Sequence, residues 1–264
     1  MLTVTRPDGA EIAWYDEGSG SAVLLVMGLA YPAAAWFRQV PVLAGQHRVL
    51  SVDNRGAGAT GLVAGAPYTV ETMTEDCLAV LDAAGVEKAH VVGISMGGLM
   101  AQELGLEHPH RVQSLTLMAT HSGIASSVWP QEVHDFLAAR ASMGAQERGE
   151  FSIPFNYHPA TPRHLIEEDW TAREAGTAGP EGYAAQGGTA LWSGFERLPS
   201  MTVPTQVVAG AQDRLVVPEN SEIIAARVPD AKLVLVEGAN HILTTDQADE
   251  VNRLLLSWFA EHEV

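Results

Sequence analysis

The stretch VVGISMGGLMAQ, residues 91–102, places a serine between two glycines at the end of an apolar run. The apolar residues before it favour a buried strand, and those after it favour a helix that continues to Pro109. A sharp strand–turn–helix junction at Ser95 requires a positive φ, which brings the residues two before and two after it close together. Gly93 and Gly97 meet that steric demand because neither carries a side chain. The pattern therefore indicates a nucleophilic serine rather than a serine in an ordinary turn.

Short runs rich in Val, Leu and Ile recur along the chain, and helical patterns lie between them. Continuous apolar runs, rather than alternating ones, are typical of parallel strands that helices cover on both faces. A hairpin with its turn at RPDG (6–9) precedes them. The sequence thus predicts an α/β fold with a mostly parallel, doubly wound sheet. The predicted strands are 22–28, 47–56, 90–95, 112–120, 205–213 and 232–238, and further predicted helices are 69–85, 218–229 and 245–262.

The alternation of strands and helices stops between residues 122 and 200, where no convincing strand is found. This stretch contains six prolines and helical patterns at 130–141 and 162–176. We expect a helical cap inserted between two strands of the sheet. The predicted organisation is an α/β core of residues 1–121 and 201–264 with a cap, or lid, of residues 122–200.

Nine of the 17 aromatic residues of the chain lie in the predicted cap. They either form the small core of the cap or line an apolar pocket over the active site, and Trp129 and Trp192 are the candidates for the pocket. His121 follows a predicted strand end, so it either contacts the substrate or makes a structural hydrogen bond.

A serine hydroxyl is a weak nucleophile that needs a general base, and an acid must orient that base. On a strand–turn–helix junction of this kind the chain order is serine, acid, histidine. Asp213 and His241 each follow the C-terminal end of a predicted strand, where open parallel sheets bind ligands. Asp213 alone is compatible with a turn cap and His241 alone with a loop histidine. Together they predict a triad with Ser95 as nucleophile, His241 as general base and Asp213 as orienting acid.

The tetrahedral intermediate of such a reaction needs two hydrogen-bond donors for its oxyanion. We expect them to be the backbone N–H of Met96, at the start of the helix, and that of Leu29, in the loop after strand 22–28. No spacing of His, Cys and carboxylate residues indicates a metal site, and no cofactor is expected.

The charge of the chain argues against two classes of partner. Its net charge is −17, with only 15 basic residues and no basic cluster, so neither nucleic acid nor an anionic membrane surface is expected as a partner.

The single cysteine, Cys77, lies on the apolar stripe of a predicted helix and is expected to be a buried packing residue. The N-terminus lacks the features of a secretory signal and no apolar run is long enough to span a membrane. We expect a cytoplasmic protein of bacterial origin.

These motifs resemble those of the α/β-hydrolase superfamily over nearly the whole chain. The resemblance rests on GISMGG, on Asp213 in GAQDRLVVPENS and on His241 in EGANHILTTDQADEV. It extends to VDNRGAGATG, which is similar to the D-x-R-G-x-G loop of that family at residues 53–58, with Thr60 where serine is usual. The resemblance implies that this loop is structural.

Met27-Gly28 stands where the superfamily usually has His-Gly. The Met-Gly version is similar to that of bacterial methyl esterases that act on polyketide antibiotics, and the rest of the chain is similar to cofactor-free esterases and enol-lactonases. Ser95 distinguishes the chain from haloalkane dehalogenases and epoxide hydrolases, which place aspartate there. The resemblance implies an intact triad beside an oxyanion loop of altered shape or hydration.

We therefore expect a serine hydrolase that cleaves a carboxylic ester or lactone of a small, fairly apolar molecule through an acyl-enzyme. The same triad also serves perhydrolysis, acyl transfer and carbon–carbon bond hydrolysis, and the fold does not separate these reactions. A ligand receptor derived from a hydrolase is a third alternative, which the complete triad disfavours. The substrate and the formation of a homo-oligomer are left open by the sequence.

Overall fold

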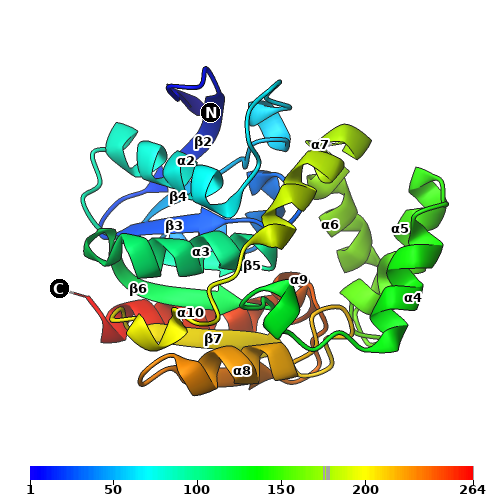
Figure 1. Ribbon diagram of the computed structural model, residues 1–264. Helices are drawn as coiled ribbons and strands as arrows, with labels where there is room; N and C mark the ends of the chain where they lie inside the picture. The colour runs from blue at the N-terminus through cyan, green and yellow to red at the C-terminus, as the bar shows by residue number, and fades with distance from the viewer. Residues whose placement is uncertain (175, 177–178, 264) are drawn as a thin grey trace.

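An eight-stranded sheet forms the centre of the computed structural model, which describes residues 1–174, 176 and 179–263 (Figure 1). The strand order is β1-β2-β4-β3-β5-β6-β7-β8. β2 is antiparallel to β1 and β4, and the other neighbouring strands are parallel. The predicted α/β fold with a mostly parallel sheet is confirmed. The strands are β1 (Leu2–Thr5), β2 (Glu11–Gly18), β3 (Ala22–Val26), β4 (Arg48–Val52), β5 (Ala89–Ile94), β6 (Val112–Met118), β7 (Thr205–Gly210) and β8 (Lys232–Val236).

Helices cover both faces of the sheet because its central strands are apolar on both sides. Side chains of α2, α3 and α8 pack in one core cluster, which includes Leu24 and Val91 of the sheet. Side chains of α1, α9 and α10 pack in a second cluster on the other face, which includes Val23 and Val92. Successive residues of a strand point to opposite faces, so both clusters draw on the same strands. These helices are α1 (Val40–Leu43), α2 (Val70–Ala83), α3 (Met96–Glu107), α8 (Glu219–Arg227), α9 (Leu243–Asp246) and α10 (Ala248–Glu261).

Residues that favour helix ends lie at both ends of helix α2. Thr69 is its N-cap, and the Thr69 side chain accepts a hydrogen bond of 3.2 Å from the backbone N–H of Thr72. Gly85, with a φ of 66°, follows its last turn. Cys77 is fully buried in this helix, and burial raises the pKa of its thiol far above the ordinary range.

Residues 122–200, called the cap segment below, connect β6 to β7. Their helices gather beyond the end of the sheet at which β3, β5 and β6 finish, on the right of Figure 1. Two of them, α4 and α6, correspond to the predicted helices 130–141 and 162–176, whereas α5, which contains Pro154, and α7 were not predicted. Residues 175, 177 and 178 of this segment lie outside the described residues. The helices are α4 (Gln131–Arg140), α5 (Ala145–Asn156), α6 (Arg163–Glu174) and α7 (Gly179–Gln186).

Several strands end earlier than the apolar runs predict. β4 ends at Val52 and β7 ends at Gly210, so Asp53 and Asp213 both lie in loops at the carboxyl edge of the sheet. Two backbone N–H groups donate to the Asp53 carboxylate, those of Ala33 at 2.7 Å and Ala59 at 2.8 Å. Such bonds compete with the strand ladder and turn the chain into a loop. Of these two aspartates, Asp213 contacts a residue of the candidate site, His241.

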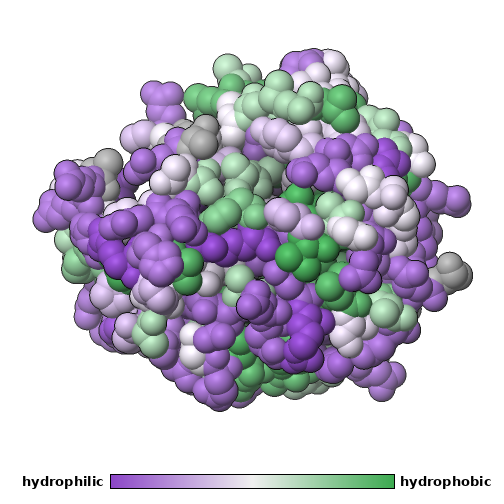
Figure 2. Space-filling view, turned by 180° about the vertical axis from the view of Figure 1, so that it is seen from behind, coloured by the Kyte–Doolittle hydropathy of each residue, from purple (hydrophilic) through white to green (hydrophobic). Residues whose placement is uncertain are grey.

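The face opposite to that of Figure 1 is mainly hydrophilic, with apolar residues in small groups between polar ones (Figure 2). Within the part of the chain that the structure describes, no helix is both long and apolar enough to cross a membrane.

Candidate active site

Ser95 lies between β5 and α3 on a backbone that few non-glycine residues adopt, with φ of 54° and ψ of −119°. Three hydrogen bonds hold this conformation. The Ser95 N–H donates to the carbonyl of Met118 at 2.9 Å, and the Ser95 carbonyl accepts from the Thr120 hydroxyl at 2.7 Å and from the Gly98 N–H at 2.9 Å. A strained residue persists only where its surroundings determine it in this way, and such residues cluster at functional sites.

The glycines around Ser95 are required by close packing. A Cβ on Gly93 would overlap the carbonyl of Gly97, and a Cβ on Gly97 would overlap the carbonyl of Val26 in β3. A Cβ on Gly98 would lie 2.5 Å from the side chain of Thr120. The helix therefore starts directly against the sheet, as the motif predicts.

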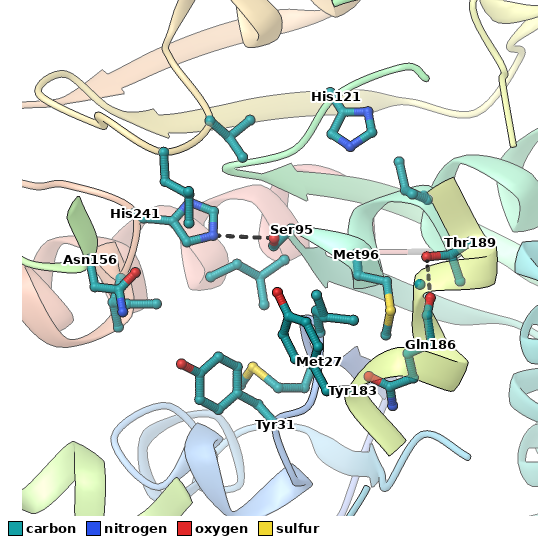
Figure 3. A pocket seen from close by; sticks show the side chains of 18 of the residues that line it. Met27, Tyr31, Ser95, Met96, His121, Asn156, Tyr183, Gln186, Thr189 and His241 are labelled. Atoms are coloured by element: carbon teal, nitrogen blue, oxygen red, sulfur yellow. Dashed lines mark hydrogen bonds between the residues drawn. The ribbon is translucent and has the colours of Figure 1, made fainter. Parts of the chain in front are cut away.

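A continuous chain of hydrogen bonds connects Ser95 to His241 and Asp213, and Figure 3 shows the bond between Ser95 and His241. Nδ1 of His241 lies 2.9 Å from Oδ2 of Asp213 and Nε2 of His241 lies 3.2 Å from Oγ of Ser95. A carboxylate only accepts, so Nδ1 carries the proton and Nε2 accepts from the serine hydroxyl. His241 and Asp213 are both buried. The three residues thus have the geometry of a nucleophile, a base and an orienting acid.

The carboxylate of Asp213 is held in place by the loop that follows it. Its Oδ1 accepts hydrogen bonds from the backbone N–H groups of Leu215 at 2.8 Å and Val216 at 3.0 Å, which leaves Oδ2 for His241. The carboxylate thus accepts three hydrogen bonds at its four lone-pair sites, and it cannot rotate without breaking these bonds.

The two expected oxyanion donors lie beside Ser95. Met96 is the first residue of α3, and Leu29 belongs to the loop after β3. A Cβ on Gly28 would lie 3.2 Å from Cβ of Ser95, so this loop packs directly against Ser95. No described residue accepts a hydrogen bond from the N–H of Leu29 or Met96. Both donors are available to an oxygen that enters the cavity.

A cavity of about 270 Å³ lies beside Ser95 and His241, between the carboxyl edge of the sheet and the cap segment. Leu29, Met96, His121 and Trp129 all line it. Its walls are mainly apolar, which suits the apolar part of a small ligand. The apolar side chains include Met27, Ala35, Ile94, Leu99, Ile124, Phe136, Leu137, Leu215, Val216 and Ile242.

His121 lies at the wall of the cavity, and its ring packs edge-to-face on that of Trp129, with centroids 5.2 Å apart. The Gly123 N–H donates to Nδ1 of His121 at 3.1 Å. Burial, and then the charge of protonated His241, lower the pKa of His121 to about 4. The ring is therefore neutral at pH 7 and carries its proton on Nε2. In Figure 3 one ring nitrogen of His121 is directed toward Ser95 and Met96.

The expectation that Trp192 lines the pocket is wrong. Trp192 is buried but is not among the described residues that line the cavity, and its Nε1 donates a hydrogen bond of 2.8 Å to the Glu103 carboxylate on α3. Arg197 pairs with the same carboxylate at 2.7 Å. A buried indole N–H needs an acceptor, and Glu103 supplies one on the flank of α3, away from the cavity.

The sequence did not predict the polar group at the wall of the cavity. Asp169 and Arg173 are i,i+4 neighbours on α6, pair at 2.5 Å and line the cavity. Arg173 also donates to the Tyr31 hydroxyl, and Asp169 accepts from Tyr157 at 2.5 Å and from Thr245 at 3.1 Å. The i,i+4 spacing was the only available signal, and it is more often that of an exposed ion pair.

Gln186, at the end of α7, also lines the cavity and was not predicted from the sequence. Its side chain is fully buried and bonds to the loop after β3. A single glutamine in a segment without a motif gives no sequence signal.

The D-x-R-G loop has a structural role, as the resemblance implies. Arg55 is fully buried and its guanidinium pairs with Asp76 at 2.6 Å and with Asp8 at 3.0 Å. The Thr60 hydroxyl donates a hydrogen bond of 2.6 Å to the Asp53 carbonyl.

Among the described residues, no group of three or more His, Cys, Asp or Glu side chains could hold a metal ion.

Residues 21–247 match the sequence profile of the family described as "alpha/beta hydrolase fold". The protein named "Putative carbamate hydrolase RutD" from Azorhizobium caulinodans is 31% identical over 256 residues, which cover 96% of each chain. "3-oxoadipate enol-lactonase 1" from Acinetobacter baylyi is 26% identical, over 94% of this chain and 93% of its own. A thermophilic esterase from Thermogutta terrifontis has a TM-score of 0.85 at 26% identity, and the match covers 99% of both chains. The similarity therefore includes the cap segment as well as the serine motif.

Proposed function

This chain belongs to the α/β-hydrolase family, and we propose that it hydrolyses a carboxylic ester or lactone of a small, largely apolar molecule. The observation that carries the proposal is the hydrogen-bonded chain of Ser95, His241 and Asp213 beside an apolar cavity. An esterase and an enol-lactonase among the similar proteins support the same substrate class.

The first half of the reaction is attack on the carbonyl carbon of the substrate by Oγ of Ser95. Nε2 of His241 accepts the hydroxyl proton, and Asp213 stabilises the imidazolium that forms. The N–H groups of Leu29 and Met96 donate to the oxyanion of the tetrahedral intermediate, and the N-terminus of α3 adds favourable electrostatics. His241 then gives its proton to the leaving alkoxide, and the acyl group stays on Ser95.

The second half is deacylation by water. His241 takes a proton from the water molecule as its oxygen attacks the acyl carbon, and a second tetrahedral intermediate forms in the same oxyanion site. Collapse of this intermediate returns the proton to Oγ of Ser95 and releases the carboxylic acid. With a lactone, the alcohol and the acid belong to one product molecule.

The wall of the cavity indicates which substrates fit. Apolar side chains surround most of it, and its volume of about 270 Å³ suits a small molecule. Trp129 and His121 form one part of the wall, where the neutral His121 ring donates its Nε2–H to an acceptor atom of the substrate. The carbamate named for one relative is attacked at the same type of carbonyl carbon, so carbamates belong among the test substrates.

The test is a panel of 4-nitrophenyl esters of increasing acyl length, lactones and an aryl carbamate, with Ser95→Ala as the control. We expect a burst of 4-nitrophenol equal to the enzyme concentration, and a loss of about 10⁴-fold or more in kcat for Ser95→Ala. Undiminished ester turnover by Ser95→Ala would contradict the mechanism. Product analysis with added peroxide, an alcohol or a diketone distinguishes hydrolysis from perhydrolysis, acyl transfer and carbon–carbon cleavage.

A further inference from the structure

The side chain of Gln186 joins the cap segment to two loops at the carboxyl edge of the sheet. Its Oε1 accepts a hydrogen bond of 2.6 Å from the backbone N–H of Ala30, and its Nε2 donates one of 2.9 Å to the carbonyl of Arg55. The residue is fully buried, and its own carbonyl accepts from the Thr189 hydroxyl at 2.8 Å (Figure 3). Both ends of this buried amide are thus used.

The loop after β3 depends on contacts with other segments for its shape. The Met27 carbonyl accepts from the Asn54 side chain at 2.9 Å, and the Gly28 carbonyl accepts from the Tyr31 N–H at 3.3 Å. The Ala30 N–H is the one that Gln186 binds. No described residue accepts a hydrogen bond from the N–H of Leu29, which lines the cavity. The direction of this N–H therefore depends on the other hydrogen bonds of the loop.

Ala30 is the strained residue of this loop. Its φ is 66°, a left-handed conformation that residues with a Cβ rarely adopt. A loop strained in this way relaxes when its holding contacts are removed. Ala30, which donates to Gln186, is the residue next to Leu29. Loss of this hydrogen bond therefore acts directly on the N–H of Leu29.

We infer that Gln186 is a positioning residue, which holds the oxyanion loop in its donating conformation and so couples the cap segment to catalysis. The inference rests on the proposed function, since it assigns the Leu29 N–H to the oxyanion. Gln186 touches no reacting atom and acts through Ala30 and Leu29. Removal of one oxyanion donor costs about 10²- to 10³-fold in kcat, and a displaced donor costs part of that.

Gln186→Met tests the inference because methionine has a similar length and volume but cannot make either hydrogen bond. We expect kcat for 4-nitrophenyl butyrate to fall about 10- to 100-fold, with a change in KM below about threefold. The matched control is Gln206→Met in β7, since Gln206 is also buried and donates its Nε2–H to Thr116 at 3.0 Å, outside the cavity lining. Thermal unfolding of both variants reports any general loss of stability.

The affinity for a boronic acid inhibitor distinguishes a positioning role of Gln186 from a role in stability alone. It forms a tetrahedral adduct with a reactive serine, and one adduct oxygen occupies the oxyanion site. Gln186→Met should weaken inhibition by butylboronic acid by the same factor as kcat/KM, whereas Gln206→Met should not. Equal kcat and equal boronate affinity in Gln186→Met and wild type would overturn the inference alone. A wild-type protein that neither hydrolyses esters nor binds the boronate would instead overturn the proposed function.

Gln186→Glu is a second test of the positioning role, for the case that Gln186→Met does not fold. A protonated glutamic acid accepts from Ala30 and donates to the Arg55 carbonyl as the amide does, but the carboxylate places an oxygen without a proton against that carbonyl. We expect the ratio of kcat in this variant to kcat in wild type to rise at least about fivefold from pH 8 to pH 5.5, because burial raises the pKa of the introduced carboxyl. A ratio independent of pH would contradict the inference.

Discussion

The backbone N–H of Gly123 donates a hydrogen bond of 3.1 Å to Nδ1 of His121, and this contact determines which ring nitrogen carries the proton. Burial lowers the pKa of His121 to about 4, so the neutral ring has its single N–H at Nε2. Trp129 packs edge-to-face on the ring and limits its rotation. One wall of the cavity therefore has a fixed, uncharged hydrogen-bond donor.

We expect substitution of His121 to change selectivity rather than the chemistry. His121→Phe should raise KM about 3- to 10-fold for esters with a second carbonyl or ether oxygen, the value of one lost hydrogen bond. His121→Gln, which keeps an N–H donor, should restore most of the affinity. The measurement is kcat and KM for matched esters with and without the second oxygen. An equal effect on both esters would contradict the role of the donor.

Asp213→Asn should lower kcat about 10³- to 10⁴-fold while leaving the fold intact. The asparagine carbonyl still accepts from Leu215 and Val216, but its amide group then faces Nδ1 of His241. The imidazole has to carry its proton on Nε2, where it no longer accepts from Ser95. Steady-state kinetics beside a circular dichroism spectrum check this. A loss below tenfold would show that His241 needs no orienting acid.

Gly97→Ala should destabilise the protein by more than about 3 kcal/mol, because its Cβ would overlap the Val26 carbonyl in a rigid part of the sheet. Gly144→Ala is the matched control, since no atom lies within 4 Å of an added Cβ there and its φ of −66° suits alanine. Urea denaturation of the two variants gives the comparison. Similar free energies of unfolding would show that the turn at Ser95 tolerates a side chain.

Acid should destabilise the protein through its buried histidines. His90 is fully buried and accepts or donates at Nδ1 with the Ser114 hydroxyl at 2.7 Å. Burial, and then the charge of His47, lower the pKa of His90 to about 4, against about 6.5 in the unfolded chain. The unfolded state therefore binds more protons below pH 6.5, and stability is lost as the pH falls toward 4.

From pH 7 to pH 5 this one residue should account for about 2 kcal/mol of the free energy of unfolding. His90→Gln removes the titrating group, so its stability should fall less steeply over the same range. Guanidinium denaturation at both pH values measures the two slopes. An equal change in the free energy of unfolding between the two pH values for wild type and His90→Gln would contradict the role of His90 in acid destabilisation.

Much of the fold could be predicted because its signals are local. The apolar runs give the strands of the sheet, and Thr69 and Gly85 mark the ends of α2. The cap segment was harder, because α5 contains Pro154 and α7 has only eight residues, two of which are glycines, Gly179 and Gly182. Trp192 and Trp129 look alike in the sequence, yet one donates to Glu103 inside the core and the other lines the cavity.

The sequence by itself determined the turn at Ser95, because the steric need for Gly93 and Gly97 is local, and it determined the chain order of the three candidate catalytic residues. Only the tertiary structure decided that Nε2 of His241 lies 3.2 Å from Oγ of Ser95, and that Gln186 binds the loop next to Leu29. Ser95 and His241 are 146 positions apart, and Gln186 and Ala30 are 156 apart. Contacts over such separations depend on how the sheet and the cap segment pack, and packing direction leaves no periodic trace in the sequence of either segment.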